Sequence, residues 1–198
     1  MTKEHILKIA TQEFSRLGYD AVSMNNLAKE LELNKATIYY HFKDKKSLYQ
    51  EVIKNAINHN QDNAEKLINS DLDIKEKFKQ YIKILVSKFQ SNPQIVSITL
   101  REIANLGSNV ENVVEQDIDK EIIYLKEIVT KLDLKDKYKD IDFHMIKSFV
   151  MGTSMTYYSM QMSNLTLNEL KEFDKDSDKI FDYLSDLISN ILLDALCK

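Results

Sequence analysis

The chain has 198 residues, 43% of them hydrophobic, so it can bury a sizeable core in one domain or two small ones. A single cysteine excludes a disulfide framework, and no apolar run approaches the ~20 residues of a membrane span. Residues 1–50 hold eight Lys and Arg against six Asp and Glu, and the remainder holds 19 against 25, so a basic end precedes an acidic body. With no apolar run behind the basic residue at its start, the chain is expected to be cytoplasmic and to have no membrane partner.

Apolar residues recur at helical spacing, and Gly and Pro are scarce, which predicts an all-α protein of about nine helices. The first is expected over residues 3–17 and should end at Gly18, in the left-handed conformation of a C-terminal cap. Three more are each expected to begin at a capping residue: 24–31 after Ser23, 35–41 after Asn34, and 45 to about 70 after Asp44. Five further helices are expected around 78–91, 93–105, 113–132, 142–162 and 180–195, with a connector over 163–176.

The most informative segment runs from Leu27 to Lys45. It predicts a short helix, a tight turn and a second helix crowded with Lys, Thr, Tyr and His, which is a helix-turn-helix whose second helix enters a DNA major groove. The segment therefore indicates binding of double-stranded DNA rather than catalysis. Its apolar positions are expected to form the core of the motif: Leu27, Ala28, Leu31, Leu33, Ile38, Phe42 and Leu48.

Residues 4–50 resemble the tetracycline-repressor (TetR) family of bacterial transcriptional regulators. An ordered set of positions carries the resemblance: Ala10, Phe14, Gly18-Tyr19, Ser23, Leu27-Ala28, Leu33, Lys35 to Tyr39, His41 to Lys45, and Leu48. The remaining three quarters resemble the family only in helix pattern. The resemblance implies an N-terminal three-helix DNA-binding domain over residues 1–46 and a helical ligand-binding and dimerisation domain over 47–198. Glu32 departs from the family by standing where Gly is usual, and a positive φ there would cost roughly 1 kcal/mol.

Ten residues are candidate DNA contacts: Ser23, Asn25, Asn34, Lys35, Ala36, Thr37, Tyr39, Tyr40, His41 and Lys45. Asn34 should orient the helix, Lys35 can donate to guanine O6 or N7, and the methyl of Ala36 can meet a thymine methyl. The tyrosines and His41 can hydrogen-bond phosphates or stack along sugars. The resemblance implies that Lys45 binds a phosphate from a helix N-terminus. For Asn25 an ordinary solvated position fits the pattern equally well.

The resemblance also implies a small-molecule effector inside helices five to eight, whose binding releases DNA. Candidate ligand contacts are Phe78, Tyr81, Ile82, Leu85, Phe89, Ile103, Tyr124, Ile128, Phe149 and Met155, in stripes rich in aromatic residues and in flexible Met. Such stripes are more often plain core packing, and that alternative stays open. An apolar or aromatic effector is expected, with one polar group facing Arg101 or His144.

The apolar face of the last helix is wider than one partner helix needs, which favours a homodimer. The resemblance implies that the last two helices pair with those of a second subunit, and Gly152 would permit close approach. The alternative is that both helices bury their apolar faces within one subunit. The expected dimer residues are Gly152, Ile180, Leu184, Leu187, Ile188, Ile191 and Leu192.

No metal-ligand spacing, phosphate-binding loop or catalytic triad pattern stands out, so no cofactor, metal or enzyme activity is expected. The sequence predicts a homodimeric repressor that a small apolar or aromatic molecule releases from its operator. The alternative is a helical ligand carrier or structural dimer without functional DNA binding. The intact segment from Thr37 to Lys45 argues against that alternative.

Overall fold

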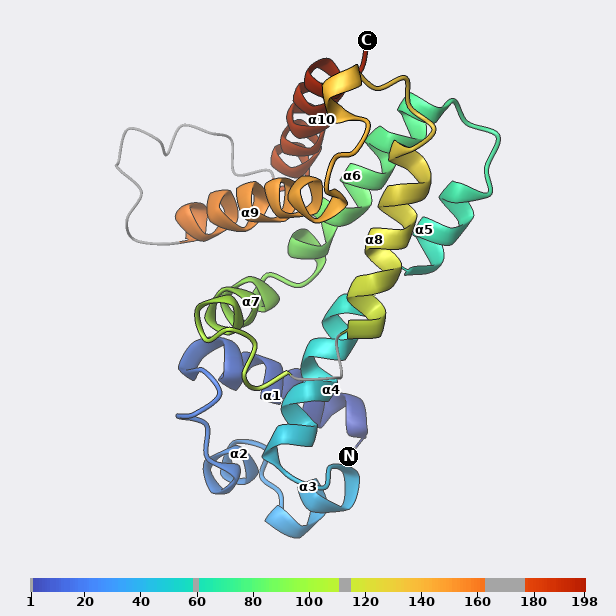
Figure 1. Cartoon of the computed structure of the whole chain (residues 1–198). Coiled ribbons are helices and arrows are strands. Elements are labelled where there is room, and N and C mark those ends of the chain that lie inside the picture. The colour runs from blue at the N-terminus through green and yellow to red at the C-terminus, as the bar shows by residue number, and fades with distance from the viewer. Residues whose placement is uncertain (1, 59–60, 111–114, 163–176) are drawn as a thin grey trace. The chain divides into compact units, whose positions relative to one another are not determined.

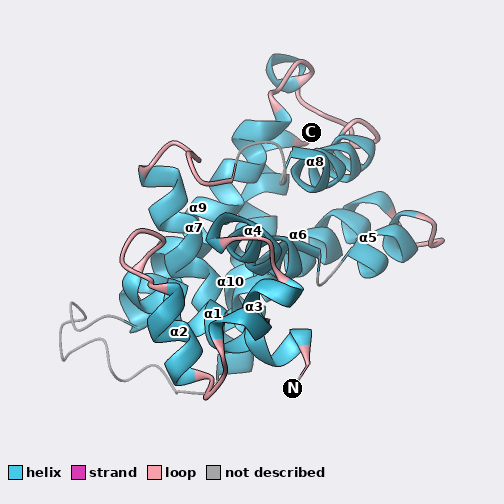
Figure 2. Cartoon of the chain, turned by 90° about the horizontal axis from the view of Figure 1, so that it is seen from below, coloured by secondary structure: helices cyan, strands magenta, loops and turns pink. Residues whose placement is uncertain are grey.

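The structure is a computed structural model that describes residues 2–58, 61–110, 115–162 and 177–198. These residues form ten α-helices and one short 3₁₀ helix, with no β-strand among them (Figure 2). The predicted all-α class is therefore confirmed. The helices fall into two compact packing units, which are described separately.

The N-terminal unit combines Met1–His59 with Asn92–Asp117. Its helices are α1 (Lys3–Leu17), α2 (Met24–Glu30), α3 (Lys35–His41), α4 (Lys45–Asn58) and α7 (Gln94–Ala104), as Figure 1 shows. Helix α1 packs against α2, α4 and α7, and α2 packs against α3. Large side chains that are almost wholly buried fill this core: Ile6, Phe14, Leu27, Ile38, Leu48, Tyr49 and Ile98.

The C-terminal unit combines Asn60–Ser91 with Ile118–Lys198. It contains α5 (Gln61–Ile68), α6 (Ile74–Ser91), α8 (Glu115–Val129), the 3₁₀ helix η1 (Asp136–Tyr138), α9 (Phe143–Met162) and α10 (Ser177–Leu196). Helix α6 is central because it packs against α5, α9 and α10. The α6 stripe that faces these neighbours is fully buried: Phe78, Tyr81, Ile82, Leu85 and Phe89.

Local sequence signals set most helix starts in the N-terminal unit. The backbone N–H of Asn25 donates to Ser23 Oγ at 3.3 Å, and that of Ala36 donates to Asn34 Oδ1 at 3.0 Å. Ser47 donates to Asp44 Oδ1 from its backbone N–H at 2.7 Å. All three predicted N-caps are confirmed, because these side chains satisfy amides that an initiating helix leaves without partners.

Two residues with positive φ lie in this region, one before the helix-turn-helix and one in its turn. Gly18 ends α1 with φ 80° and ψ 167°, so its φ is positive as predicted, but its ψ is not that of the left-handed helical region. Glu32 takes φ 54° in the turn between α2 and α3. The condition that the sequence analysis attached to Glu32 is therefore met, and its side chain occupies a conformation that glycine adopts without strain.

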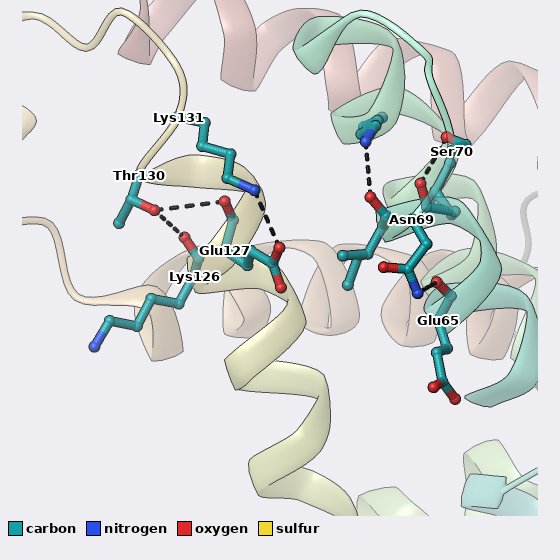
Figure 3. Close-up of polar contacts among 10 residues, drawn as sticks. Glu65, Asn69, Ser70, Lys126, Glu127, Thr130 and Lys131 are labelled. Atoms are coloured by element: carbon teal, nitrogen blue, oxygen red, sulfur yellow. Dashed lines mark hydrogen bonds and ion pairs between the residues drawn. The ribbon is translucent and has the colours of Figure 1, made fainter.

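Polar contacts also secure the carboxyl ends of α5 and α8 (Figure 3). Asn69 Nδ2 donates to the Glu65 carbonyl at 3.0 Å, and Thr130 Oγ1 donates to the Lys126 carbonyl at 2.8 Å. Beside Thr130, Lys131 pairs with Glu127 on the surface of α8. Each of these carbonyls also accepts the backbone N–H of the same residue, Asn69 or Thr130, so the side chain adds a second hydrogen bond at the helix end.

Several predicted boundaries need correction. The single helix expected from 45 to 70 is two helices, α4 and α5, so the described residues contain ten α-helices where about nine were expected for the chain. Leu33 was expected in the core but is only half-buried, because it follows the turn rather than lying on a packed helix face. The connector expected over 163–176 lies outside the described residues, as does Val113, where the seventh predicted helix begins.

The packing units do not follow the predicted split at residue 46. Helix α7 lies far along the chain yet packs with α1 and α4, and α4 continues the N-terminal unit beyond residue 46. The predicted boundary concerns function, and as a functional boundary it stays a prediction.

Candidate nucleic-acid interface and effector domain

Helix α3 presents polar and aromatic side chains to solvent. Tyr40 is 86% exposed and Tyr39 is 40% exposed, although large aromatic residues usually bury most of their surface. Ala36 is also exposed, and Ile38 is the residue that anchors the helix in the core. The face that points away from the core is therefore available for a partner.

Neighbouring contacts pre-arrange the side chains of this face. The Lys35 ammonium lies 5.5 Å from the centroid of the Tyr39 ring, one helical turn further on. The Tyr40 and His41 rings meet edge to face at 5.2 Å. Thr37 lies half-buried between these groups in the chain, and Ser23 and Asn25 are exposed at the start of α2. All ten predicted DNA contacts therefore belong to one packing unit, on α2, α3 and the start of α4.

Lys45 contacts the loop between α1 and α2. Its ammonium donates to the Asp20 carbonyl at 3.1 Å and lies 4.5 Å from the centroid of the Tyr19 ring. Partial burial lowers the pKa of Lys45, and the Asp20 carboxylate opposes that shift. The side chain thus connects the start of α4 to the loop before the helix-turn-helix.

A buried hydrogen bond that the sequence pattern did not reveal links α4 and α7. Tyr49 Oη donates to Glu102 Oε1 at 2.7 Å, and Asn109 Nδ2 donates to the same oxygen at 3.1 Å. Burial, with the Glu102 carboxylate next in importance, raises the pKa of Tyr49. The sequence signal for a buried Glu102 was its position four residues after Ile98 and three before Asn105. This spacing places it on the side of α7 that faces α1 and α4. Arg101 was expected near a ligand but donates to the Arg16 carbonyl at 3.4 Å within this unit.

The predicted ligand contacts divide by burial. Six are buried in the C-terminal unit (Phe78, Tyr81, Ile82, Leu85, Phe89 and Ile128), and so is Met155 on α9. Tyr124 is half-buried, whereas Phe149 is 44% exposed. Ile103 is 59% exposed and lies on α7 in the N-terminal unit, so it is not part of the same cluster. His144, expected to face the effector, is exposed near the start of α9.

The C-terminal unit also contains a buried ionic cluster that the sequence interpretation missed. Lys88 of α6 and Lys147 of α9 pair with opposite carboxylate oxygens of Glu121 on α8, the second at 2.8 Å. The signal was spacing: Lys88 lies seven residues after Tyr81, and Glu121 lies four before Leu125, so both fall on buried stripes.

The predicted dimer residues separate into two sets. Leu184, Ile188 and Leu192 are buried within the subunit, because that side of α10 packs against α6. Leu187 and Ile191 are 44% and 47% exposed on the other side. The expectation that all of these residues face a second subunit therefore needs correction for the first three. Gly152 and Ile180 are partly exposed.

Within the described residues, no group of three or more His, Cys, Asp or Glu side chains is placed to hold a metal ion. A search of the same residues found no helix with the length and hydropathy of a bilayer span.

Comparison with known proteins bears on the N-terminal unit. Residues 6–52 match the family model described as bacterial regulatory proteins, tetR family. This segment, where the likeness to the family lies, is roughly a quarter of the chain. The matched segment begins in α1 and ends in α4, so it contains the whole helix-turn-helix.

Two relatives are transcriptional regulators. An uncharacterised HTH-type regulator of Bacillus subtilis, YhgD, is 27% identical over 125 residues, which are 63% of this chain and 65% of that protein. The negative regulator IcaR of the Staphylococcus aureus biofilm operon icaADBC is 40% identical over 52 residues, which are 26% of this chain and 28% of IcaR. The chain thus spans less than two thirds of the length of either relative.

The overall fold has a close counterpart among solved structures. The transcriptional regulator FadR of Bacillus subtilis, solved in complex with stearoyl-CoA, has a TM-score of 0.69 at 16% identity. The match covers 98% of this chain and 99% of FadR. At this identity the likeness concerns the fold alone and not the ligand.

Proposed function

We propose that this chain is a homodimeric, DNA-binding transcriptional repressor that a small molecule releases from its operator. The observation that carries the proposal is the exposed polar and aromatic face of α3, held by the Asn34 cap inside a TetR-family helix-turn-helix. A helix of this composition and exposure suits the major groove. Repression is proposed because the relative IcaR is described as a negative regulator.

The DNA-binding part is tested by selecting genomic fragments with the purified full-length protein and measuring affinity by fluorescence anisotropy. Lys35→Ala should relax preference at one base position, at a cost of about 1–3 kcal/mol. Tyr39→Ala should weaken binding to all sequences alike. Lys131→Ala is the matched control, because it removes the same charge from an exposed position just after α8. Failure to enrich any fragment would favour the carrier or structural-dimer alternative.

Dimerisation is supported by two exposed apolar stripes. Helix α9 exposes Met145, Phe149 and Met160, and α10 exposes Tyr183, Leu187 and Ile191 at intervals of four residues. A Cβ added at Gly152 would meet nothing within 4 Å among the described residues, so a second helix has room to approach there. A contiguous exposed apolar surface is a usual sign of an interface.

The oligomeric state tests this surface. Leu187→Glu with Ile191→Glu should give a folded monomer by light scattering and circular dichroism. The double substitution Leu184→Glu with Ile188→Glu is the contrasting pair, and it should unfold the chain because those residues are buried within the subunit. A dimer of unchanged mass after the first pair of substitutions would contradict the proposed interface.

Ligand control is supported by the buried aromatic stripe of α6 and by Met155 of α9, which packs in the same unit. FadR, whose fold is similar, was solved with stearoyl-CoA. An effector acts only through its different affinity for the DNA-binding and released states, and such coupling is typically about 1–3 kcal/mol. Met155→Trp should narrow the interior and abolish the ligand response while leaving DNA affinity nearly unchanged. A compound screen by thermal shift identifies the effector to be used.

A further inference from the structure

Three helices of the C-terminal unit place charged groups at one buried point. The Glu121 carboxylate of α8 forms two ion pairs. Its Oε1 contacts the Lys88 ammonium from α6, and its Oε2 contacts the Lys147 ammonium from α9. The side chains of Glu121 and Lys88 are each only 9% exposed, and that of Lys147 is 14% exposed. The two ammonium groups therefore already form a binding site for one carboxylate, and Glu121 occupies it.

The surroundings of this cluster are aromatic and apolar. Tyr81 Oη donates to the backbone carbonyl of Glu121 at 2.7 Å, so the same residue is held at two points. A small cavity of about 10 Å³ adjoins Lys88 and Glu121 and is also lined by Tyr81, Tyr124 and Leu85. That volume is about the room that one water needs. Charged side chains thus line one part of this cavity, and aromatic and apolar side chains line the rest.

Stability alone does not account for this cluster. Removing charges from water is costly, and buried ion pairs can often be replaced by packed apolar residues without loss of stability. The cluster interrupts the α6 stripe, since Lys88 lies between the fully buried Leu85 and Phe89. Ionisable groups brought together inside an apolar interior are a frequent mark of a functional site.

We propose that Lys88 and Lys147 bind the anionic head of the effector, and that Glu121 is an internal stand-in for that head. The effector class is an amphiphile with a carboxylate head and an apolar chain, which would lie along Tyr81, Tyr124 and Leu85. This inference rests on the proposed function, because it names the effector of the same regulator. Entry of the ligand head displaces the Glu121 carboxylate and so loosens α8 from α6 and α9.

The probes are four compounds with the same twelve-carbon chain: dodecanoate, dodecyl phosphate, dodecanol and dodecyltrimethylammonium. Each is titrated into the full-length protein below its micelle concentration, by isothermal calorimetry and thermal shift. Dodecanoate should bind at least about tenfold more tightly than dodecanol, because its charged head gains hydrogen bonds from both lysines. The cationic compound should not bind. Tighter binding of dodecyl phosphate than of dodecanoate would overturn the assignment of a carboxylate head.

Substitutions then locate the site. Lys88→Met and Lys147→Met should each weaken the binding of dodecanoate at least about tenfold, because each removes a charge-assisted hydrogen bond. Glu121→Gln should strengthen the binding of dodecanoate, because this substitution removes the internal carboxylate that competes for the two lysines. Lys131→Met is the matched control at an exposed position just after α8, and its dodecanoate affinity should equal that of the wild type. Weaker binding by Glu121→Gln would overturn the stand-in role.

The comparison of the four compounds on the wild-type protein needs no substitution, so the proposal can fail even if a variant does not fold. Equal affinity for dodecanoate and dodecanol would overturn it. DNA release is measured separately by operator anisotropy. Binding of dodecanoate without DNA release would support the anion site and contradict the ligand switch. DNA release by other compounds, with no anionic amphiphile binding, would support the switch and contradict the anion site.

Discussion

Replacing Tyr49 by Phe should destabilise the N-terminal unit through one lost hydrogen bond. Tyr49 is 1% exposed and Glu102 is 7% exposed, so water does not replace the missing hydroxyl. A hydrogen bond to a charged group is worth about 1.5–3 kcal/mol. The lower end, about 1.5 kcal/mol, is expected because Asn109 still donates to Glu102 Oε1. The other carboxylate oxygen, Oε2, is buried and has no hydrogen-bond partner among the described residues, so no second contact compensates the loss.

The assay is urea unfolding followed by circular dichroism at one fixed protein concentration, because dimerisation couples stability to concentration. Tyr40→Phe is the control, since that hydroxyl is on a side chain 86% exposed and its loss should change stability by less than about 0.5 kcal/mol. In a Glu102→Leu background, Tyr49→Phe should cost almost nothing, because both partners are then removed together. An equal cost of Tyr49→Phe in both backgrounds would refute the hydrogen bond as the source of the stabilisation.

Three further outcomes follow from single residues. Asp44→Ala should lower the free energy of unfolding by about 1 kcal/mol at pH 7 in urea titrations. Because the Ser47 hydrogen bonds lower the pKa of Asp44 below its ordinary 3.8, this difference should persist above pH 3.8 and shrink as the pH falls below it. Glu32→Gly should raise the urea midpoint, with a gain of up to about 1 kcal/mol, because glycine adopts φ 54° without strain; an unchanged or lower midpoint would contradict this. Cys197 is buried and burial raises its pKa, so it should react with a disulfide reagent at pH 8 more slowly than in urea-unfolded protein.

The helix-turn-helix was predictable because its signals are local. Capping at Ser23, Asn34 and Asp44 depends on residues two or three positions apart, and the structure places each cap as the sequence predicted. The positive φ of Glu32 followed from comparing one position with the usual family glycine. The sequence did not predict which helices pack against α7. Its contacts with α1 and α4 join distant parts of the chain, and local patterns do not encode such contacts.

The same limit explains the errors in the C-terminal half. An apolar stripe shows that a face is covered but not what covers it, so Leu184 and Ile188 were assigned to a second subunit although α6 covers them. Conversely, spacing places Lys88 and Glu121 on buried stripes but does not indicate that they pair, and most Lys and Glu residues are exposed. Their pairing depends on three helices meeting, and no spacing within one helix encodes that meeting.

The observed contacts of Lys45 are compatible with its predicted role in binding a phosphate. The resemblance implies a phosphate ligand, whereas the structure shows its ammonium bonded to the Asp20 carbonyl and lying over the Tyr19 ring. An ammonium has three N–H donors, and the Asp20 carbonyl accepts from one of them. The Tyr19 ring packs on Tyr49 at 4.9 Å, so the position of Lys45 is fixed by the core of the N-terminal unit. A lysine held in this way loses little further side-chain freedom when a phosphate arrives, which favours binding over an unrestrained surface lysine. The loop contact therefore supports, rather than replaces, the proposed phosphate contact at the start of α4.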